Sequence, residues 1–226
     1  MNFALTHRAE YTPQEAHWQY VEHFAEAMGK QSIEFPLPID NDFEDYLVAH
    51  DVDMLFISCV NSRREIQYYL NYCRELRIPY LFLLDTTIGL TLPHTILLPV
   101  TLLEEEVHKA QFCAHIARFC KAEVLILRAH DYGHKALQNA QKIITFLEKF
   151  EVAFSESTAV KDSFSMWREL PQVQRERECN LTILTASREY GLDDIIFGPP
   201  ERAVISRSTA PVMLVNPRGD LYSLCD

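Results

Sequence analysis

Glycine is scarce in this sequence, with 6 residues among 226. Phosphate-binding loops need glycine because a Cβ atom keeps the backbone away from the phosphate. The chain contains neither the P-loop pattern G-x-x-x-x-G-K-[ST] nor the dinucleotide-binding pattern G-x-G-x-x-G. The G-x-S-x-G elbow of serine hydrolases is missing as well. These gaps argue against the nucleotide-binding enzymes and hydrolases that such motifs define.

Basic residues are also few relative to acidic residues. The chain carries 21 Lys and Arg against 32 Asp and Glu, a formal net charge of −11. Nucleic acids and anionic membranes attract a basic footprint, so neither is an expected partner. No apolar run approaches the roughly 18 residues of a membrane span, and the start MNFALTH shows no signal-peptide pattern. We therefore expect a cytoplasmic protein.

Paired cysteine motifs are missing too. The six cysteines are scattered, without a C-x-x-C pair, at positions 59, 73, 113, 120, 179 and 225. Cys113 and Cys120 are seven residues apart in one predicted helix and share its buried face. This usage predicts reduced core thiols, in keeping with a cytoplasmic location.

What is present is a regular alternation of apolar strands and amphipathic helices. The predicted strands are 3–6, 33–37, 54–60, 79–84, 95–101, 123–129, 152–155, 181–185 and 211–215. Helices are predicted at 42–50, 103–120 and 134–150, around 164–170, and in a short segment before the last strand. Two further helices are predicted from their caps: one begins at Thr12, the cap of a capping box, and one is capped by Ser62. Such alternation predicts an α/β fold, with parallel sheets that carry helices on both faces.

The pattern restarts after residues 85–94, which resemble a joint. Four strands precede the joint and five follow it, so the first half lacks one strand–helix unit. We therefore expect an internal duplication with a shortened first domain at 1–90, a complete second domain at 94–217 and a tail at 218–226.

One segment, residues 181–216, combines a buried strand, a loop that closes on Gly-Pro-Pro, a short helix and a second buried strand. Together with Pro99-Val100-Thr101 at the end of an earlier strand, it resembles the universal stress protein family. That family carries the pattern G-x2-G-x9-G-[ST] and commonly has an Asp after Pro-Val. The nine residues between Arg188 and Gly198, EYGLDDIIF, match the family spacing. The resemblance implies an adenine nucleotide alpha hydrolase-like fold, in tandem.

The resemblance also implies the residues of a pocket. They are Val100, Thr101, Thr185, Arg188, Gly198 and Pro199. Four of the five positions that would contact a nucleotide are changed. Thr185 and Arg188 replace glycines, Pro199 removes an N–H and a hydroxyl, and Thr101 is not a carboxylate. We therefore expect a degraded nucleotide site and no cofactor, with ATP or another adenine nucleotide as the alternative that stays open.

The family resemblance implies a regulatory or stress-response protein that acts by binding and is not an enzyme. Its last strands often pair with those of another domain, so strands 79–84 and 211–216 are expected to pair within this chain. Self-association into a homodimer, or a protein partner, is a further expectation.

Two alternatives stay open. Arg188, with Arg202 and Arg207, could bind a nucleotide or another anion through guanidinium groups. The chain could instead be a hydrolase-like enzyme, with Cys59 or His7 at the end of a strand as the reactive group. His130 and His134 are disfavoured as metal ligands because they flank a loop, and Glu104–Glu106 is interpreted as the acidic first turn of a helix.

Overall fold

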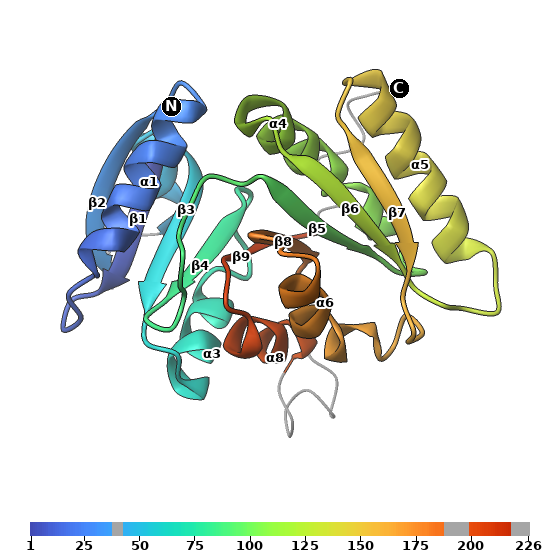
Figure 1. The fold of residues 1–226 in the computed structure, drawn as a ribbon. Coiled ribbons are helices and arrows are strands. Elements are labelled where there is room, and N and C mark those ends of the chain that lie inside the picture. Colours follow the sequence, from blue (N-terminus) through green and yellow to red (C-terminus); the bar gives the residue numbers. More distant parts are fainter. Residues whose placement is uncertain (38–42, 188–198, 218–226) are drawn as a thin grey trace.

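The computed structural model describes residues 1–37, 43–187 and 199–217. Nine strands form one sheet in the order β2-β1-β3-β4-β9-β8-β5-β6-β7 (Figure 1). Their bounds are β1 Asn2–Arg8, β2 Gln31–Leu37, β3 Val52–Cys59, β4 Tyr80–Leu84, β5 Thr95–Val100, β6 Glu123–Arg128, β7 Phe154–Thr158, β8 Leu181–Thr185 and β9 Val212–Val215. This arrangement confirms the predicted α/β class and its mainly parallel sheet.

The sheet has two halves that meet in its middle. Strands β1–β4 pair in parallel, and so do β5–β9. Between the halves, β4 pairs with β9 in antiparallel fashion, with Leu81 opposite Met213. The predicted pairing of the last strand of each half, 79–84 with 211–216, is therefore confirmed. Because the halves run in opposite directions, the carboxyl ends of their strands lie at opposite edges of the sheet.

Helices cover both faces (Figure 1). One face carries α1 (Glu15–Ala27), α4 (Ala110–Cys120) and α5 (Lys135–Lys149). The other carries α2 (Phe43–Ala49), α3 (Arg63–Tyr72), α6 (Leu170–Glu176) and α8 (Pro200–Arg207). In the part of the chain that is described, no helix is both long and apolar enough to span a membrane.

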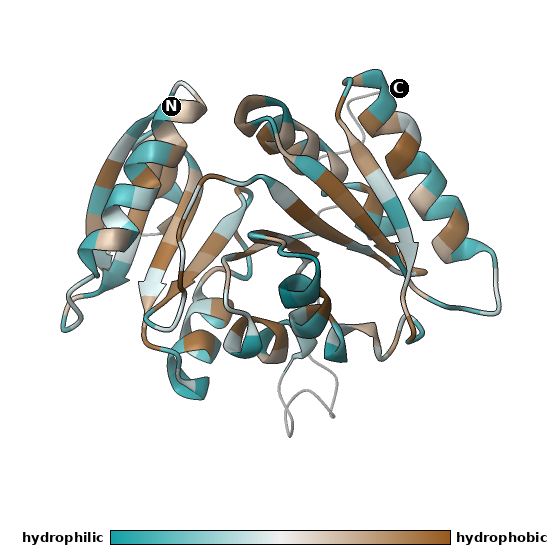
Figure 2. Ribbon diagram, viewed as in Figure 1, coloured by the Kyte–Doolittle hydropathy of each residue, from teal (hydrophilic) through white to brown (hydrophobic). Residues whose placement is uncertain are grey.

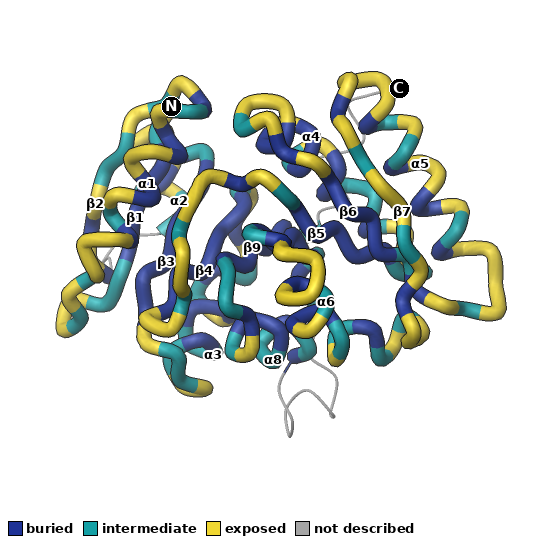
Figure 3. The backbone as a smooth tube through the Cα atoms, viewed as in Figure 1, coloured by how far each residue is buried: buried dark blue, intermediate teal, exposed yellow. Residues whose placement is uncertain are grey.

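The central strands are apolar on both sides because helices cover both sides. All five residues of β4, YLFLL, are buried. The outer strand β7, FSEST, has no buried residue. Figures 2 and 3 show this change from apolar, buried strands at the centre to mixed, exposed ones at the rim. Continuous apolar runs thus predicted the sheet core correctly.

Three helix boundaries differ from the prediction. Helix α1 begins after Gln14, not at Thr12, and no side chain caps it. The Gln14 side-chain amide donates to the Asp85 carbonyl at 3.3 Å, which connects the residue before α1 to the residue after β4. The predicted helix 164–170 is a 3₁₀ turn, η2 (Met166–Arg168), followed by α6.

The third difference matters most for the site. The predicted helix 103–120 is divided into a 3₁₀ helix, η1 (Glu104–Val107), and α4. Thr101 accepts a hydrogen bond from the backbone N–H of Leu103, and its hydroxyl donates to Glu106. This local bonding competes with a regular helix start and turns Glu106 inward. The acidic run is therefore more than a surface first turn.

Candidate functional site

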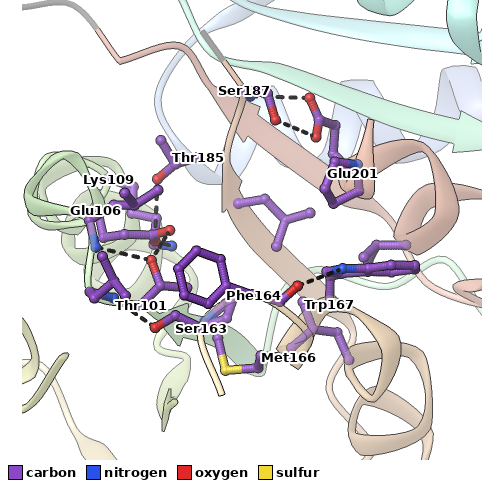
Figure 4. A pocket seen from close by; sticks show the side chains of 17 residues that line it. Thr101, Glu106, Lys109, Ser163, Phe164, Met166, Trp167, Thr185, Ser187 and Glu201 are labelled. Atoms are coloured by element: carbon purple, nitrogen blue, oxygen red, sulfur yellow. Dashed lines mark hydrogen bonds and ion pairs between the residues drawn. The ribbon is translucent and has the colours of Figure 1, made fainter. Parts of the chain in front are cut away.

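A cavity of about 260 Å³ lies beyond the carboxyl ends of β5 and β8 (Figure 4). The chain leaves β5 toward β6 on one side, while β8 flanks β5 on the other. Ligands in doubly wound sheets bind at this kind of switch point. The cavity is therefore the candidate functional site in the described part of the chain.

Its polar end is a buried ion pair with two hydroxyls. The Glu106 and Lys109 side chains contact each other, and the residues are 7% and 1% exposed. Thr101 donates to Glu106 Oε1 at 3.0 Å, and Thr185 donates to Glu106 Oε2 at 3.4 Å. Because a buried carboxylate is costly without partners, Lys109 and the hydroxyls hold Glu106 in place.

Neighbouring elements fix this polar end. The Asn139 amide, from α5, donates to the carbonyls of Thr101 and Leu103 at 3.0 and 2.9 Å. Ser163 accepts from the Leu102 N–H at 2.9 Å, and Asp131 accepts from the Ser163 N–H at 2.9 Å. Asp131 thus connects the loop before α5 to the segment that carries Phe164 to the cavity. The polar end is positioned by three separate segments.

A second carboxylate occupies the start of α8. Glu201 lies in the first turn of this helix and is 4% exposed. It accepts from the Ser187 N–H at 3.1 Å and from the Ser187 hydroxyl at 2.9 Å. A helix N-terminus favours negative charge, and here the chain supplies that charge itself.

The remaining wall is apolar and partly aromatic. Trp167 donates its indole N–H to the Phe164 carbonyl at 3.2 Å, which fixes the ring. Phe164 lines the cavity yet is 80% exposed, so its ring lies at the opening. The other apolar lining residues include Met166, Leu170, Leu184 and Val204. The cavity therefore joins an apolar body to one polar end.

The residues implied by the resemblance are placed unequally. Thr101 and Thr185 line the cavity together. Val100 is fully buried in the core on the α1–α4–α5 face, and Pro199 is buried as the residue before α8. Arg188 and Gly198 lie outside the described residues.

Three lining residues, Glu106, Lys109 and Glu201, were not expected at the site from the sequence. The signal for the first two was Glu-x-x-Lys a few residues after a strand at the switch point. The signal for Glu201 was an acidic residue in the first turn of the helix that follows Gly-Pro-Pro. Both patterns also occur at ordinary helix starts, so they could not be separated from surface charge.

The corresponding switch point of the N-terminal half lies between β1 and β3, and a buried polar contact lies there at the end of β3. His17, from α1, is fully buried, and its Nδ1 lies 2.7 Å from the Ser58 hydroxyl. Burial lowers the pKa of His17, while the nearby Leu84 carbonyl and Asp85 oppose that shift. Burial also raises the pKa of Tyr11, next to Ser58.

The residues behind the enzyme alternative have other contacts. Cys59 is 1% exposed, and burial raises the pKa of its thiol far above the ordinary value. His7 Nε2 lies 3.3 Å from Glu34. The Cys59 thiol is therefore not readily ionised, and the His7 ring lies next to a carboxylate.

The remaining candidates are also placed. Arg202 donates to the Gln67 side chain at 2.8 Å, toward α3. His134 is the residue before α5, and His130 lies in the loop between β6 and α5, two residues after the strand ends. Within the described ranges, no group of three or more His, Cys, Asp or Glu residues is arranged to hold a metal ion.

No family model and no curated protein matches the sequence. Solved structures do match. A universal stress protein from Archaeoglobus fulgidus DSM 4304 has a TM-score of 0.65 at 11% identity, covering 97% of this chain and 87% of its own. A functionally unknown protein from Pseudomonas aeruginosa PAO1 has a TM-score of 0.55 at 12% identity, covering 95% and 82%. The chain therefore has the fold of the universal stress proteins.

Proposed function

We propose that this protein is a cytoplasmic, universal-stress-type regulatory protein that acts by binding at the β5–β8 cavity, not by catalysis. We further propose that the site has lost the ability to hold nucleotide phosphates. The observation that carries the proposal is Glu201, whose carboxylate occupies the first turn of α8.

The electrostatics of the cavity support this proposal. Glu201 takes the Ser187 backbone N–H that would otherwise be free for an oxyanion. The cationic residue at the polar end of the cavity, Lys109, is already paired with Glu106. A polyphosphate would bring several negative charges next to two buried carboxylates, a costly arrangement in a site of low dielectric.

The low accessibility of the candidate reactive groups supports binding over catalysis. A cysteine nucleophile needs an accessible, readily ionised thiol and a nearby base. Cys59 is buried with a raised pKa. Turnover of any substrate that Cys59→Ala or His7→Ala abolishes would contradict a binding role.

We also propose that residues 1–90 are a shortened copy of the domain at 94–217. The order β2-β1-β3-β4 matches β6-β5-β8-β9 and lacks only a counterpart of β7. Helices α3 and α8 hold equivalent places and meet through the Arg202 guanidinium, which donates to the Gln67 side chain at 2.8 Å. Asn61, two residues before α3, also donates to the Ser206 carbonyl at 3.0 Å. The β4–β9 contact then replaces a dimer contact, and further homodimers would form elsewhere.

Calorimetric titration with Mg-ATP, ADP and AMP tests the loss of the phosphate site. We expect no binding in the micromolar range, and mass spectrometry of denatured, freshly purified protein should release no nucleotide. Micromolar binding of ATP would overturn the proposal. If Arg188→Ala then abolished that binding while Arg207→Ala kept it, the anion-binding alternative would replace it.

A further inference from the structure

The chemistry of the cavity lining narrows the ligand class, and the inference rests on the proposed binding function. Three residues carry formal charge among the described lining residues: Glu106, Lys109 and Glu201. Their sum is −1 at neutral pH. The rest of the lining is apolar or carries hydroxyl groups.

The size of the cavity sets a second limit. An apolar cavity of about 150 Å³ holds benzene, and drug-sized ligands occupy pockets of roughly 300–1,000 Å³. At about 260 Å³, this cavity fits one substituted ring. The aromatic rings of Phe164 and Trp167 line the same cavity and offer flat apolar surfaces (Figure 4).

The polar end favours a neutral hydrogen-bond donor. A carboxylate has about four acceptor positions. Glu106 uses three of these positions: one for Lys109, one for Thr101 and one for a long bond from Thr185. Acceptor capacity is therefore left for a ligand hydroxyl or N–H. An anionic group would meet Glu106 and Glu201, and a cationic group would meet the Lys109 ammonium.

We propose that the β5–β8 cavity binds a small, uncharged aromatic compound with one hydroxyl or N–H group. The ring lies against Phe164 and Trp167, and the donor group points to Glu106 and Thr185. This ligand class differs from a nucleotide in charge, in size and in the contacts that recognise it.

Four probes with the same ring test the class: 4-methylphenol, toluene, 4-methylbenzoate and 4-methylbenzylamine. The indole N–H of Trp167 serves as the reporter in NMR spectra of protein with ¹⁵N-labelled tryptophan, with Trp18→Phe to assign the two signals. We expect 4-methylphenol to shift the Trp167 signal in a saturable way. Toluene should bind roughly fivefold more weakly, because it lacks one neutral hydrogen bond. The two charged probes should give no saturable shift.

Variants connect the binding to named residues. Phe164 is exposed, so Phe164→Ala keeps the fold, and we expect it to weaken 4-methylphenol roughly fivefold. Tyr132→Ala removes another exposed aromatic ring that does not line the cavity, and it should change nothing. The double variant Glu106→Gln with Lys109→Met should remove most of the preference for 4-methylphenol over toluene.

Several results would overturn the proposal. They are no saturable shift with 4-methylphenol, tighter binding of either charged probe, or equal affinity in Phe164→Ala and wild-type protein. These outcomes are separate from the ATP titration. Nucleotide binding would contradict the lost phosphate site. A protein that binds neither nucleotides nor 4-methylphenol would contradict only the proposed ligand class.

Discussion

The two switch points of the sheet have the same topology but differ in the side chains and the space found there. Between β1 and β3, His17 and Ser58 form a buried polar contact, and Tyr11 lies beside them. Between β5 and β8, the chain leaves a cavity of about 260 Å³ with a buried ion pair at one end. The same strand order therefore accompanies a buried polar contact in one half, here called the closed site, and a cavity in the other, here called the open site.

Topology alone therefore does not leave a cavity at a switch point, because the side chains at the strand ends decide whether one remains. Helix α1 follows β1 and directs His17 onto the end of β3. After β5 the chain forms η1, and Glu106 and Lys109 stay at the border of the cavity instead of filling it. Four experiments test this contrast.

The largest effect is expected at the ion pair of the open site. Lys109→Met leaves the Glu106 carboxylate buried without its cation, which should lower the free energy of unfolding by about 3–5 kcal/mol. Urea denaturation monitored by circular dichroism measures this change. The double variant with Glu106→Gln should recover most of the loss, and the exposed Lys135→Met should lose little. A single variant as stable as wild type would show that the pair is not a structural part of the site.

A smaller effect is expected at the closed site. Ser58→Ala removes the hydroxyl that contacts His17 and should cost about 1–3 kcal/mol, because the imidazole is left buried without that partner. A cycle with His17→Phe, followed by urea denaturation, should show that the two losses are not additive. Additive losses would mean that the contact does not couple the two residues.

The closed site should also make stability depend on pH. The His17 pKa is lowered in the folded state from an ordinary value of 6.5, chiefly by burial. Below pH 6.5 the unfolded chain therefore binds a proton that the folded chain does not, and stability falls as the pH falls. Thermal unfolding between pH 8 and pH 5 should show a smaller acid loss in His17→Phe than in wild type. The exposed His134→Gln is the control, and an unchanged acid loss in His17→Phe would rule out this source.

The smallest effect concerns thiol reactivity, which should be slow in both halves. Burial raises the pKa of Cys113 to about 12 and of Cys120 and Cys179 to about 11. In a Cys225→Ser background, which removes the cysteine outside the described residues, a disulfide reagent at pH 8 should modify native protein far more slowly than urea-unfolded protein. Rapid labelling of Cys59 in the native state would reopen the enzyme alternative.

The fold could be predicted far better than the site. Apolar runs such as YLFLL at β4 depend only on burial, so the strands and their order in the chain were recognisable. The division of the predicted helix into η1 and α4 accompanies side-chain hydrogen bonds such as the one from Thr101 to Glu106, which periodicity does not report. Of the six expected pocket residues, Thr101 and Thr185 line the cavity, because strand ends are set by topology. Glu106, Lys109 and Glu201 meet there through tertiary packing, which a local pattern cannot show.

The antiparallel seam between β4 and β9 joins parts of one polypeptide. Where such a seam joins separate molecules, dilution separates them, but here both sides stay at a fixed local concentration. The seam therefore does not depend on expression level. Because the two sides are different segments of one chain, their sequences need not be identical, and a substitution in one side does not appear in the other. Substitutions can therefore change the site of one half while the other half keeps a structural role.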